Sequence, residues 1–323
     1  MADVTSVGPA NPRAETTPPD LSRWCEGNTG VPYLWTFSGR RPGLHLTLTA
    51  ILHGNESCGA IAISRLLEAG LRPRCGRITV ILANVDAYER TERSKSAPVR
   101  FVDEDMNRVW SPDALDGPRD TVELRRARRI RPFLDTTDIL LDLHSMQHGT
   151  EPMLLCGART KGLDLAREVG FPATIVADRG HVTGVRLRDY GDFDDPSSPK
   201  AALLVECGQH GSPMSTAVAI GTALLFLRRF GAVSDRILAE HLPPRPLAPQ
   251  RLIEVTDTVT AETDRFRFAK SYAGLEAIAT GGTVIARDGG RPITTPYDQC
   301  VLVMPARRCQ AGQTAVRLGR VVA

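Results

Sequence analysis

Short apolar runs alternate with amphipathic stretches between residues 44 and 230 of the chain. Apolar runs rich in β-branched residues predict strands, whereas apolar residues spaced three and four positions apart predict helices. Gly70 marks the expected end of the first helix. We predict strands at 44–52, 77–84, 138–143, 173–177 and 201–205, and helices at 59–71, 122–134, 163–169 and 215–230.

This alternation predicts an α/β fold in which helices cover both faces of a sheet. The prolines of 241–250 disfavour a helix and mark a linker. Beyond it, short alternating strands separated by Gly and Pro turns predict a small all-β domain. We therefore divide the chain into a tail at 1–20 that is rich in Pro, Thr and Ala and expected to be disordered, an α/β domain at 21–240 and a β-rich domain at 241–323.

The composition is that of an ordinary globular protein, and its 323 residues suffice for a substantial core. Lys and Arg number 40 against 37 Asp and Glu, a net charge of +3, which argues against a strongly basic nucleic-acid binder. The arginine-rich run at 125–131 would place its charges on one solvated helix face. We therefore expect no nucleic-acid partner.

The seven cysteines are odd in number and widely spaced, and no C-x-x-C occurs. This pattern predicts buried reduced thiols rather than a disulfide framework or a cysteine zinc site. The N-terminus lacks the apolar region of a signal peptide. The longest apolar run, 217–227, is too short to span a bilayer. We expect a cytoplasmic protein with no membrane contact.

Polar residues that could carry chemistry follow three of the predicted strands. His53 and Glu56 follow the strand at 44–52, His144 follows directly on the strand at 138–143, and Glu206 follows the strand at 201–205. Ligands bind at the carboxyl ends of strands in such sheets. A fourth polar stretch, 100–108 (RFVDEDMNR), lies in the long connection after the second strand.

The His-x-x-Glu spacing lets the His53 imidazole and the Glu56 carboxylate converge on one ion. With His144 added, three protein ligands and an open position form the pattern of a catalytic zinc site. The pKa of a bound water would then fall to roughly 7. Glu206 is the candidate carboxylate that takes the proton of this water and returns it to a leaving amine. Such ligands also accommodate other divalent ions.

The motif by itself decides little, because His148 and Glu151 repeat it. We prefer His53 and Glu56 because a strand leads into them and a helix leads out. His53 could still be an ordinary loop histidine. Asp142 lies on the same strand face as His144, so it could orient an imidazole or be a plain strand-end carboxylate.

Four motifs occur in a fixed order: HGNE at 53–56, RFVDEDMNRVW at 100–110, DLHS at 142–145 and a strand that ends in Glu206. Together they resemble the succinylglutamate desuccinylase/aspartoacylase family, relatives of the zinc carboxypeptidases, over about residues 44–230. The resemblance implies a carboxypeptidase-like mixed sheet with a C-terminal β domain. It also implies a zinc-dependent hydrolase that cleaves the amide bond of a small N-acyl amino acid.

The resemblance further implies roles for individual residues. The residues that match the ligands of the one zinc ion are His53, Glu56 and His144. Glu206 matches the general base, and Arg100 matches the arginine that polarises the scissile carbonyl and stabilises the oxyanion.

The chain departs from the family on the substrate side. Asn107 and Arg108 match the pair that grips a substrate carboxylate, a task for which a guanidinium fork is suited. The family places another carboxylate-binding arginine before the general base. Arg186 and Arg188 are both candidates, but the spacing to Glu206 is longer than usual. The acyl group and the amino acid of the substrate therefore stay open.

The sequence leaves two alternative functions open. The same zinc machinery serves a metallocarboxypeptidase that acts on short peptides, and a non-catalytic binding protein could keep the fold, although the intact ligand set argues against it. The segment 282–305 resembles a biotinyl/lipoyl-type barrel without a lysine in its hairpin, so we interpret the β domain as a cap that narrows the cleft. We expect a carboxylate-bearing amide as the small-molecule partner, and the sequence leaves a homo-oligomer open.

Overall fold

The computed structural model describes residues 16–94, 97–180, 183–241 and 248–322. Its strands are β1 (Leu34–Ser38), β2 (Arg41–Ala50), β3 (Cys75–Leu82), β4 (Ile139–Met146), β5 (Met153–Leu155), β6 (Thr174–Ala177), β7 (Ala201–Gln209), β8 (Arg251–Thr260), β9 (Arg267–Phe268), β10 (Glu276–Ile278), β11 (Val284–Asp288), β12 (Arg291–Thr294), β13 (Cys300–Val303) and β14 (Thr314–Val321). Its helices are α1 (Ser57–Glu68), α2 (Val85–Arg93), α3 (Pro112–Leu115), α4 (Val122–Asp135), α5 (Thr160–Val169), α6 (Pro213–Arg229) and α7 (Asp235–His241).

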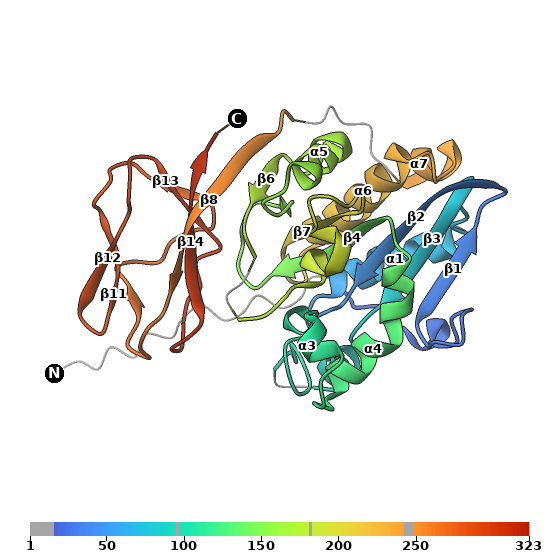
Figure 1. Cartoon of the computed structure of the whole chain (residues 1–323), viewed down its shortest axis with the longest axis horizontal. Coiled ribbons are helices and arrows are strands. Elements are labelled where there is room, and N and C mark those ends of the chain that lie inside the picture. The colour runs from blue at the N-terminus through green and yellow to red at the C-terminus, as the bar shows by residue number, and fades with distance from the viewer. Residues whose placement is uncertain (1–15, 95–96, 181–182, 242–247, 323) are drawn as a thin grey trace.

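One large sheet runs through the molecule in the order β1-β3-β2-β4-β7-β5-β6-β8-β14-β13-β10. The strands β3, β2, β4 and β7 are parallel, whereas β1 and β5 join their neighbours β3 and β7 antiparallel. The expected mixed sheet is therefore confirmed. Figure 1 shows α5, α6 and α7 on one side of this sheet and α3 and α4 on the other.

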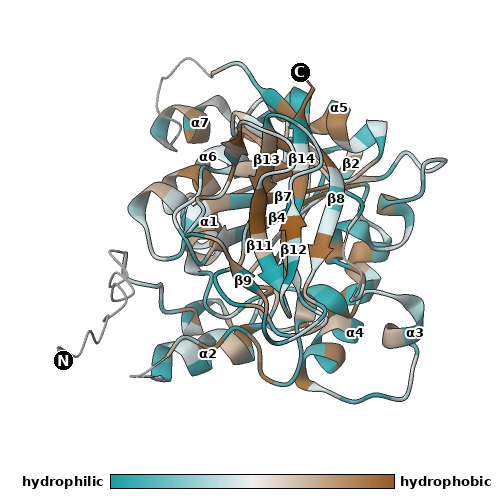
Figure 2. Ribbon diagram, turned by 90° about the vertical axis from the view of Figure 1, so that its left-hand side faces the viewer, coloured by the Kyte–Doolittle hydropathy of each residue, from teal (hydrophilic) through white to brown (hydrophobic). Residues whose placement is uncertain are grey.

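Two cores occupy the two faces of the α/β part. Alternate residues of β4 divide between them, because successive side chains of a strand point to opposite faces. Leu141 and Leu143 join the core beneath α1 and α6, whereas Leu140 joins the core beneath α3 and α4. The strands at the centre of Figure 2, such as β7 and β13, are predominantly hydrophobic, as fully buried strands should be.

Local signals begin and end the helices. The hydroxyl of Thr121 accepts a hydrogen bond from Leu124 N at the start of α4, and the hydroxyl of Ser212 does the same for Met214 N at the start of α6. Gly170 ends α5 with a φ of 72°, a conformation that suits glycine. No helix in the described part of the chain is both long enough and apolar enough to cross a membrane.

The C-terminal strands continue the large sheet. β8 pairs with β6 in parallel, and β14, β13 and β10 follow in antiparallel order. A second sheet of order β12-β11-β9 packs beside them. The described residues from 248 onward form strands and no helix, which agrees with the expected all-β part. Most of the linker proposed at 241–250 lies outside the described residues.

The tail at 1–20 is described only from residue 16. There, Thr16 N and its hydroxyl both donate to the carbonyl oxygen of Gly211, and the carbonyl oxygen of Pro19 accepts from the hydroxyl of Tyr88. The part of the tail that the structure describes therefore contacts the α/β domain.

Candidate metal centre and active site

The alternation of side chains along β2 and β4 brings polar groups to the face that α4 covers. On β4 these groups are Asp142 and His144, which alternate with the apolar Leu141 and Leu143. On the neighbouring β2, Thr49 is the register partner of Asp142, and its hydroxyl donates to Asp142 Oδ1 over 2.6 Å. The sheet therefore fixes the direction in which His144 points.

His53 and Glu56 lie in the loop between β2 and α1. Glu56 Oε1 lies 2.8 Å from His53 Nδ1, and Glu56 Oε2 lies 2.9 Å from His144 Nδ1. The loop packs tightly against α2, since a Cβ on Gly54 would lie 2.3 Å from the backbone carbon of Ala87. A glycine is therefore required in the HGNE motif for steric reasons.

The three side chains fit one metal ion. His53, Glu56 and His144 are buried, and each offers a ligand atom within 4.8 Å of the others. His144 Nε2 donates to Asp142 Oδ2 over 2.7 Å, which leaves the lone pair of Nδ1 for a metal. Two imidazoles and one carboxylate are the ligand types of a catalytic zinc site, and they confirm the expected convergence.

Asp105 orients the other imidazole. Its Oδ1 lies 2.9 Å from His53 Nε2, and its Oδ2 accepts from Arg100 Nη2 over 3.3 Å. The same guanidinium nitrogen lies 2.8 Å from His53 Nε2, and Arg100 Nη1 lies 3.4 Å from Glu56 Oε1. Because the Asp105 carboxylate can only accept, we assign the ring proton of His53 to Nε2, where it donates to Asp105. This leaves Nδ1 for the metal.

The electrostatics of the cluster suit a cation. Burial disfavours charge on His144, but the Asp142 and Glu56 carboxylates outweigh it and raise the His144 pKa well above its usual value. Burial likewise disfavours charge on Glu56, yet the imidazoles of His53 and His144 hold its pKa well below the usual value. Carboxylates so arranged stabilise positive charge between them.

Glu206 lies beside this cluster. It is the register partner of His144 across β4 and β7, and its residue is 7% exposed. Its Oε2 is buried and has no hydrogen-bond partner among the described residues. Burial, followed by the negative charge of Glu56, raises the Glu206 pKa to about 8. A carboxyl group with a pKa near neutrality can both take and return a proton.

Asn107 and Arg108 lie in a 3₁₀ turn next to Asp105. Asn107 Oδ1 accepts from Leu187 N over 2.9 Å, so this side chain holds the segment that contains the other candidate arginines. Arg108 is half-buried, and its Nη1 donates to the carbonyl oxygen of Asn107 over 2.7 Å. Burial lowers the Arg108 pKa to about 10, and the charge of Asp105 opposes this effect. The role of the pair on a substrate carboxylate stays a prediction.

Arg186 and Arg188 are buried in a charge network. Arg186 makes a bidentate pair with Asp178, with both distances 2.8 Å, and it also binds Asp189. Arg188 pairs with the other oxygen of Asp189. Arg317, from β14, is 5% exposed and lies 3.6 Å from Asp178. Sequence reasoning missed Asp178 and Arg317, because no motif links position 178 to a strand so far along the chain.

The second His-x-x-Glu pair, His148 and Glu151, lies apart from the three-residue cluster. Glu151 is exposed and pairs with Arg251 over 2.5 Å, and neither His148 nor Glu151 is in the buried three-residue cluster. The pair with the repeated His-x-x-Glu spacing at 148–151 therefore does not contribute to this cluster.

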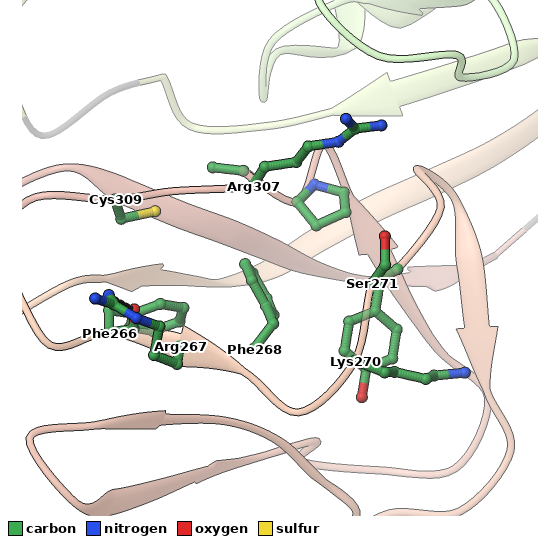
Figure 3. A pocket seen from close by; sticks show the side chains of 10 residues that line it. Phe266, Arg267, Phe268, Lys270, Ser271, Arg307 and Cys309 are labelled. Carbon is green, nitrogen blue, oxygen red and sulfur yellow. Dashed lines mark hydrogen bonds between the residues drawn. The ribbon is translucent and has the colours of Figure 1, made fainter. Parts of the chain in front are cut away.

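A hollow of about 440 Å³ lies elsewhere, between β9 and the loop that follows β13. Figure 3 shows that its cationic side chains, Arg267, Lys270 and Arg307, point to different sides rather than toward one point. No residue of the metal cluster lines it. We therefore place the candidate active site at the sheet and not in this hollow.

A family model for the succinylglutamate desuccinylase/aspartoacylase catalytic domain matches residues 42–223. The chain belongs to this family. The match contains the candidate metal ligands His53, Glu56 and His144 together with Glu206, and it identifies the chain as a member of a family of acyl amino acid hydrolases. A search of curated proteins gives no match.

Solved structures of the family share the fold. A succinylglutamate desuccinylase from Vibrio parahaemolyticus superposes with a TM-score of 0.68 and 18% identity, covering 90% of this chain and 87% of that chain. An aspartoacylase family protein from Mesorhizobium loti gives 0.59 and 19%, covering 90% and 89%. An ectoine utilization protein from Ruegeria pomeroyi gives 0.60 and 18%, covering 88% of both chains. At these identities the likeness shows the fold and leaves the substrate open.

Proposed function

We propose that this chain is a zinc-dependent hydrolase that cleaves the amide bond of a small N-acyl amino acid. The observation that carries the proposal is the convergence of His53, Glu56 and His144 beside the unpartnered carboxyl oxygen of Glu206. One bound zinc ion supplies Lewis acidity there, which stabilises negative charge on oxygen and makes a nearby water more acidic. The family membership supports the same reaction class.

The residues of the chain divide the remaining work. Glu206 takes a proton from the attacking water and delivers it to the departing nitrogen, so that water and amide become a carboxylic acid and an amine. The Arg100 side chain, 42% exposed beside Glu56, can reach a substrate and meet the negative charge that develops on the carbonyl oxygen.

The substrate is proposed to carry a carboxylate. Arg108 lies next to Asn107, and burial, together with the positive charges of nearby arginines, lowers its pKa. These arginines are Arg100, Arg186 and Arg317. Such a concentration of guanidinium groups beside a metal centre attracts an anion. We propose that Asn107 and Arg108 hold the carboxylate end, while the contribution of Arg186 and Arg188 is limited by their pairing with Asp178 and Asp189.

A substrate panel tests the proposal. Zinc-loaded protein is incubated with amino acids that carry acetyl, succinyl or formyl groups, and with short peptides, and the released amine is measured. We expect hydrolysis of at least one acylated amino acid and loss of that activity after chelation. Release of amine from the peptides alone would support a carboxypeptidase instead, and no release from any compound would contradict the proposal.

A further inference from the structure

A third imidazole, that of His210, is hydrogen-bonded to β4, the strand that carries His144. His210 directly follows β7, and its backbone N–H donates to the carbonyl oxygen of Met146 over 2.8 Å. Its ring Nδ1 lies 2.7 Å from the hydroxyl oxygen of Ser145, the residue after His144. Ser145 is itself tied to the cluster, because its backbone N–H donates to Glu56 Oε2 over 3.1 Å. The His210 ring is therefore held in a fixed orientation.

The other ring nitrogen of His210 is available. Nε2 makes no hydrogen bond with any residue in the described ranges, and it is not one of their buried unpartnered atoms. It therefore reaches solvent although the residue is half-buried. Ser145 joins this ring to Glu56, so the ring lies next to the cluster of His53, Glu56 and His144.

The surroundings also keep this ring neutral. Burial is the main cause that lowers the His210 pKa, and Arg100 and His53 lower it further, whereas Glu56 opposes them. A neutral imidazole carries one proton. When the hydroxyl of Ser145 donates to Nδ1, that proton resides on Nε2, and His210 presents a neutral N–H donor to the solvent side of the cluster.

We propose that His210 is a substrate-contacting residue whose Nε2–H donates a hydrogen bond to an oxygen of the bound acyl amino acid. The inference rests on the proposed function and adds a residue that neither the sequence motifs nor the family match assigned. Ser145 is the positioning residue, because its hydroxyl contacts Nδ1 and so fixes the direction in which Nε2 points. A neutral donor is suited to a carbonyl or carboxylate oxygen and leaves the charge balance of the metal centre unchanged.

Substitutions at His210 distinguish a contact with the substrate from a purely structural role of the side chain. His210→Phe removes the donor, and we expect kcat/KM for the hydrolysed acyl amino acid to fall about 10-fold or more. His210→Gln keeps an N–H donor and should recover part of that loss, and Ser145→Ala should weaken activity less than His210→Phe. Zinc content should stay at one ion per chain in all three. His148→Asn, on the neighbouring loop, is the matched histidine control and should retain wild-type kcat/KM.

Two kinetic outcomes would overturn the inference. An unchanged kcat/KM in His210→Phe would show that the ring makes no useful contact. An equal loss in the Phe and Gln variants would show that the N–H donor does not account for the loss. Absence of hydrolysis by the wild-type chain would instead contradict the proposed function, so the two failures are distinguishable.

A chemical experiment needs no folded His210 variant. Zinc-loaded Glu206→Gln protein is treated with diethyl pyrocarbonate, which acylates accessible imidazole nitrogens, with and without N-succinyl-L-glutamate or N-acetyl-L-aspartate. Mass spectrometry then compares His210 with His148. We expect at least one of the two compounds to protect His210 and to leave the modification of His148 unchanged. Equal modification of His210 with and without both compounds would contradict the contact.

Discussion

At the scale of the residue, Glu206 differs from the other carboxylates around the cluster. Glu56 is held by two imidazoles, Asp142 by Thr49 and His144, and Asp105 by His53 and Arg100. Only Glu206 has a buried oxygen without a hydrogen-bond partner among these four. An unpartnered carboxyl oxygen is free to exchange a proton with a water.

Glu206→Gln tests this assignment with little change in shape. The amide cannot accept the proton, so we expect kcat to fall by about 10²–10⁴. Zinc should remain bound at one ion per chain, because Glu206 is not in the ligand cluster. Metal analysis beside the rate measurement checks both points, and wild-type turnover in the variant would exclude Glu206 as the base.

Asp142 offers a separate test of the orientation of His144. Asp142→Ala removes the acceptor of the Nε2 proton and should weaken zinc affinity by about 10–100-fold. Competition with a chelator of known affinity measures the change. Asp138→Ala, which alters another carboxylate next to the start of β4, should leave zinc affinity unchanged. Equal affinities in wild type and Asp142→Ala would show that Asp142 is only a strand-end residue.

The ligand residues were predictable because each follows an apolar strand and lies at a recognisable spacing. Asp105 was not, since the stretch 100–108 contains three acids and only the fold shows which one meets His53. His210 was missed for the same reason, as its bond to Ser145 joins residues 65 positions apart. Spacing along the chain reveals local pairs and cannot reveal pairs that a sheet brings together.

At the scale of the element, the arginine-rich face of α4 is used internally. Arg126 donates to the carbonyl oxygens of Leu82 and Ala83, and Arg128 donates to several carbonyl oxygens of the loop before the helix. The sequence predicted a solvated face for these charges, and for these two side chains that prediction is wrong. Hydrogen bonds to free carbonyl groups at strand ends and loops explain the difference.

The long periodic elements were all predicted within a few residues of their bounds. Among the elements that the sequence did not predict, β1, β5 and α2 are short or polar. β1 is a five-residue edge strand and β5 has three residues, too few to show a period. α2 begins after Asn84, whose side chain caps it, and has a mostly polar sequence. Their positions depend on the sheet against which they pack.

The buried ion pair between Asp178 and Arg186 stabilises the segment after β6. Asp178→Asn leaves a buried guanidinium without its partner and should lower the free energy of unfolding by about 3–5 kcal/mol at neutral pH. Burial opposes ionisation of Asp178, but Arg186 and then Arg317 bring its pKa down to about 2. A pKa depressed in the folded state stabilises the fold above the usual value of 3.8 and ceases to do so as the pH falls toward 2.

Denaturant unfolding at several pH values measures this prediction. The difference in stability between wild type and Asp178→Asn should be largest above pH 5 and should shrink as the pH approaches 2. Asp195→Asn, which alters an exposed loop carboxylate, serves as the control. A difference that does not change with pH would contradict the pairing.

At the scale of the whole molecule, the C-terminal strands are part of one sheet. Ile253, Val301 and Val303 share a core with Met153 and Leu204 of the α/β part. Arg317 of β14 also reaches the buried network around Asp178. The sequence predicted the change to short strands but not the continuous sheet, because the pairing of β6 with β8 leaves no local pattern.

Ile253→Ala tests whether this shared core joins the two parts. Ile253 is fully buried, so we expect a loss of about 2–5 kcal/mol and a single unfolding transition in both variant and wild type. Calorimetry beside tryptophan fluorescence follows the transition, since all three tryptophans lie before residue 111. Val321→Ala, half-exposed at the end of β14, is the control. Separate transitions in the wild-type chain would contradict the shared core.

The most direct test of the account is a zinc titration of the metal-free chain. We predict one site in the wild type, a loss of affinity of at least about 100-fold in His144→Ala, and wild-type affinity in His148→Ala, because only His144 belongs to the cluster with His53 and Glu56. Equal zinc affinity in the wild type and in His144→Ala would contradict it.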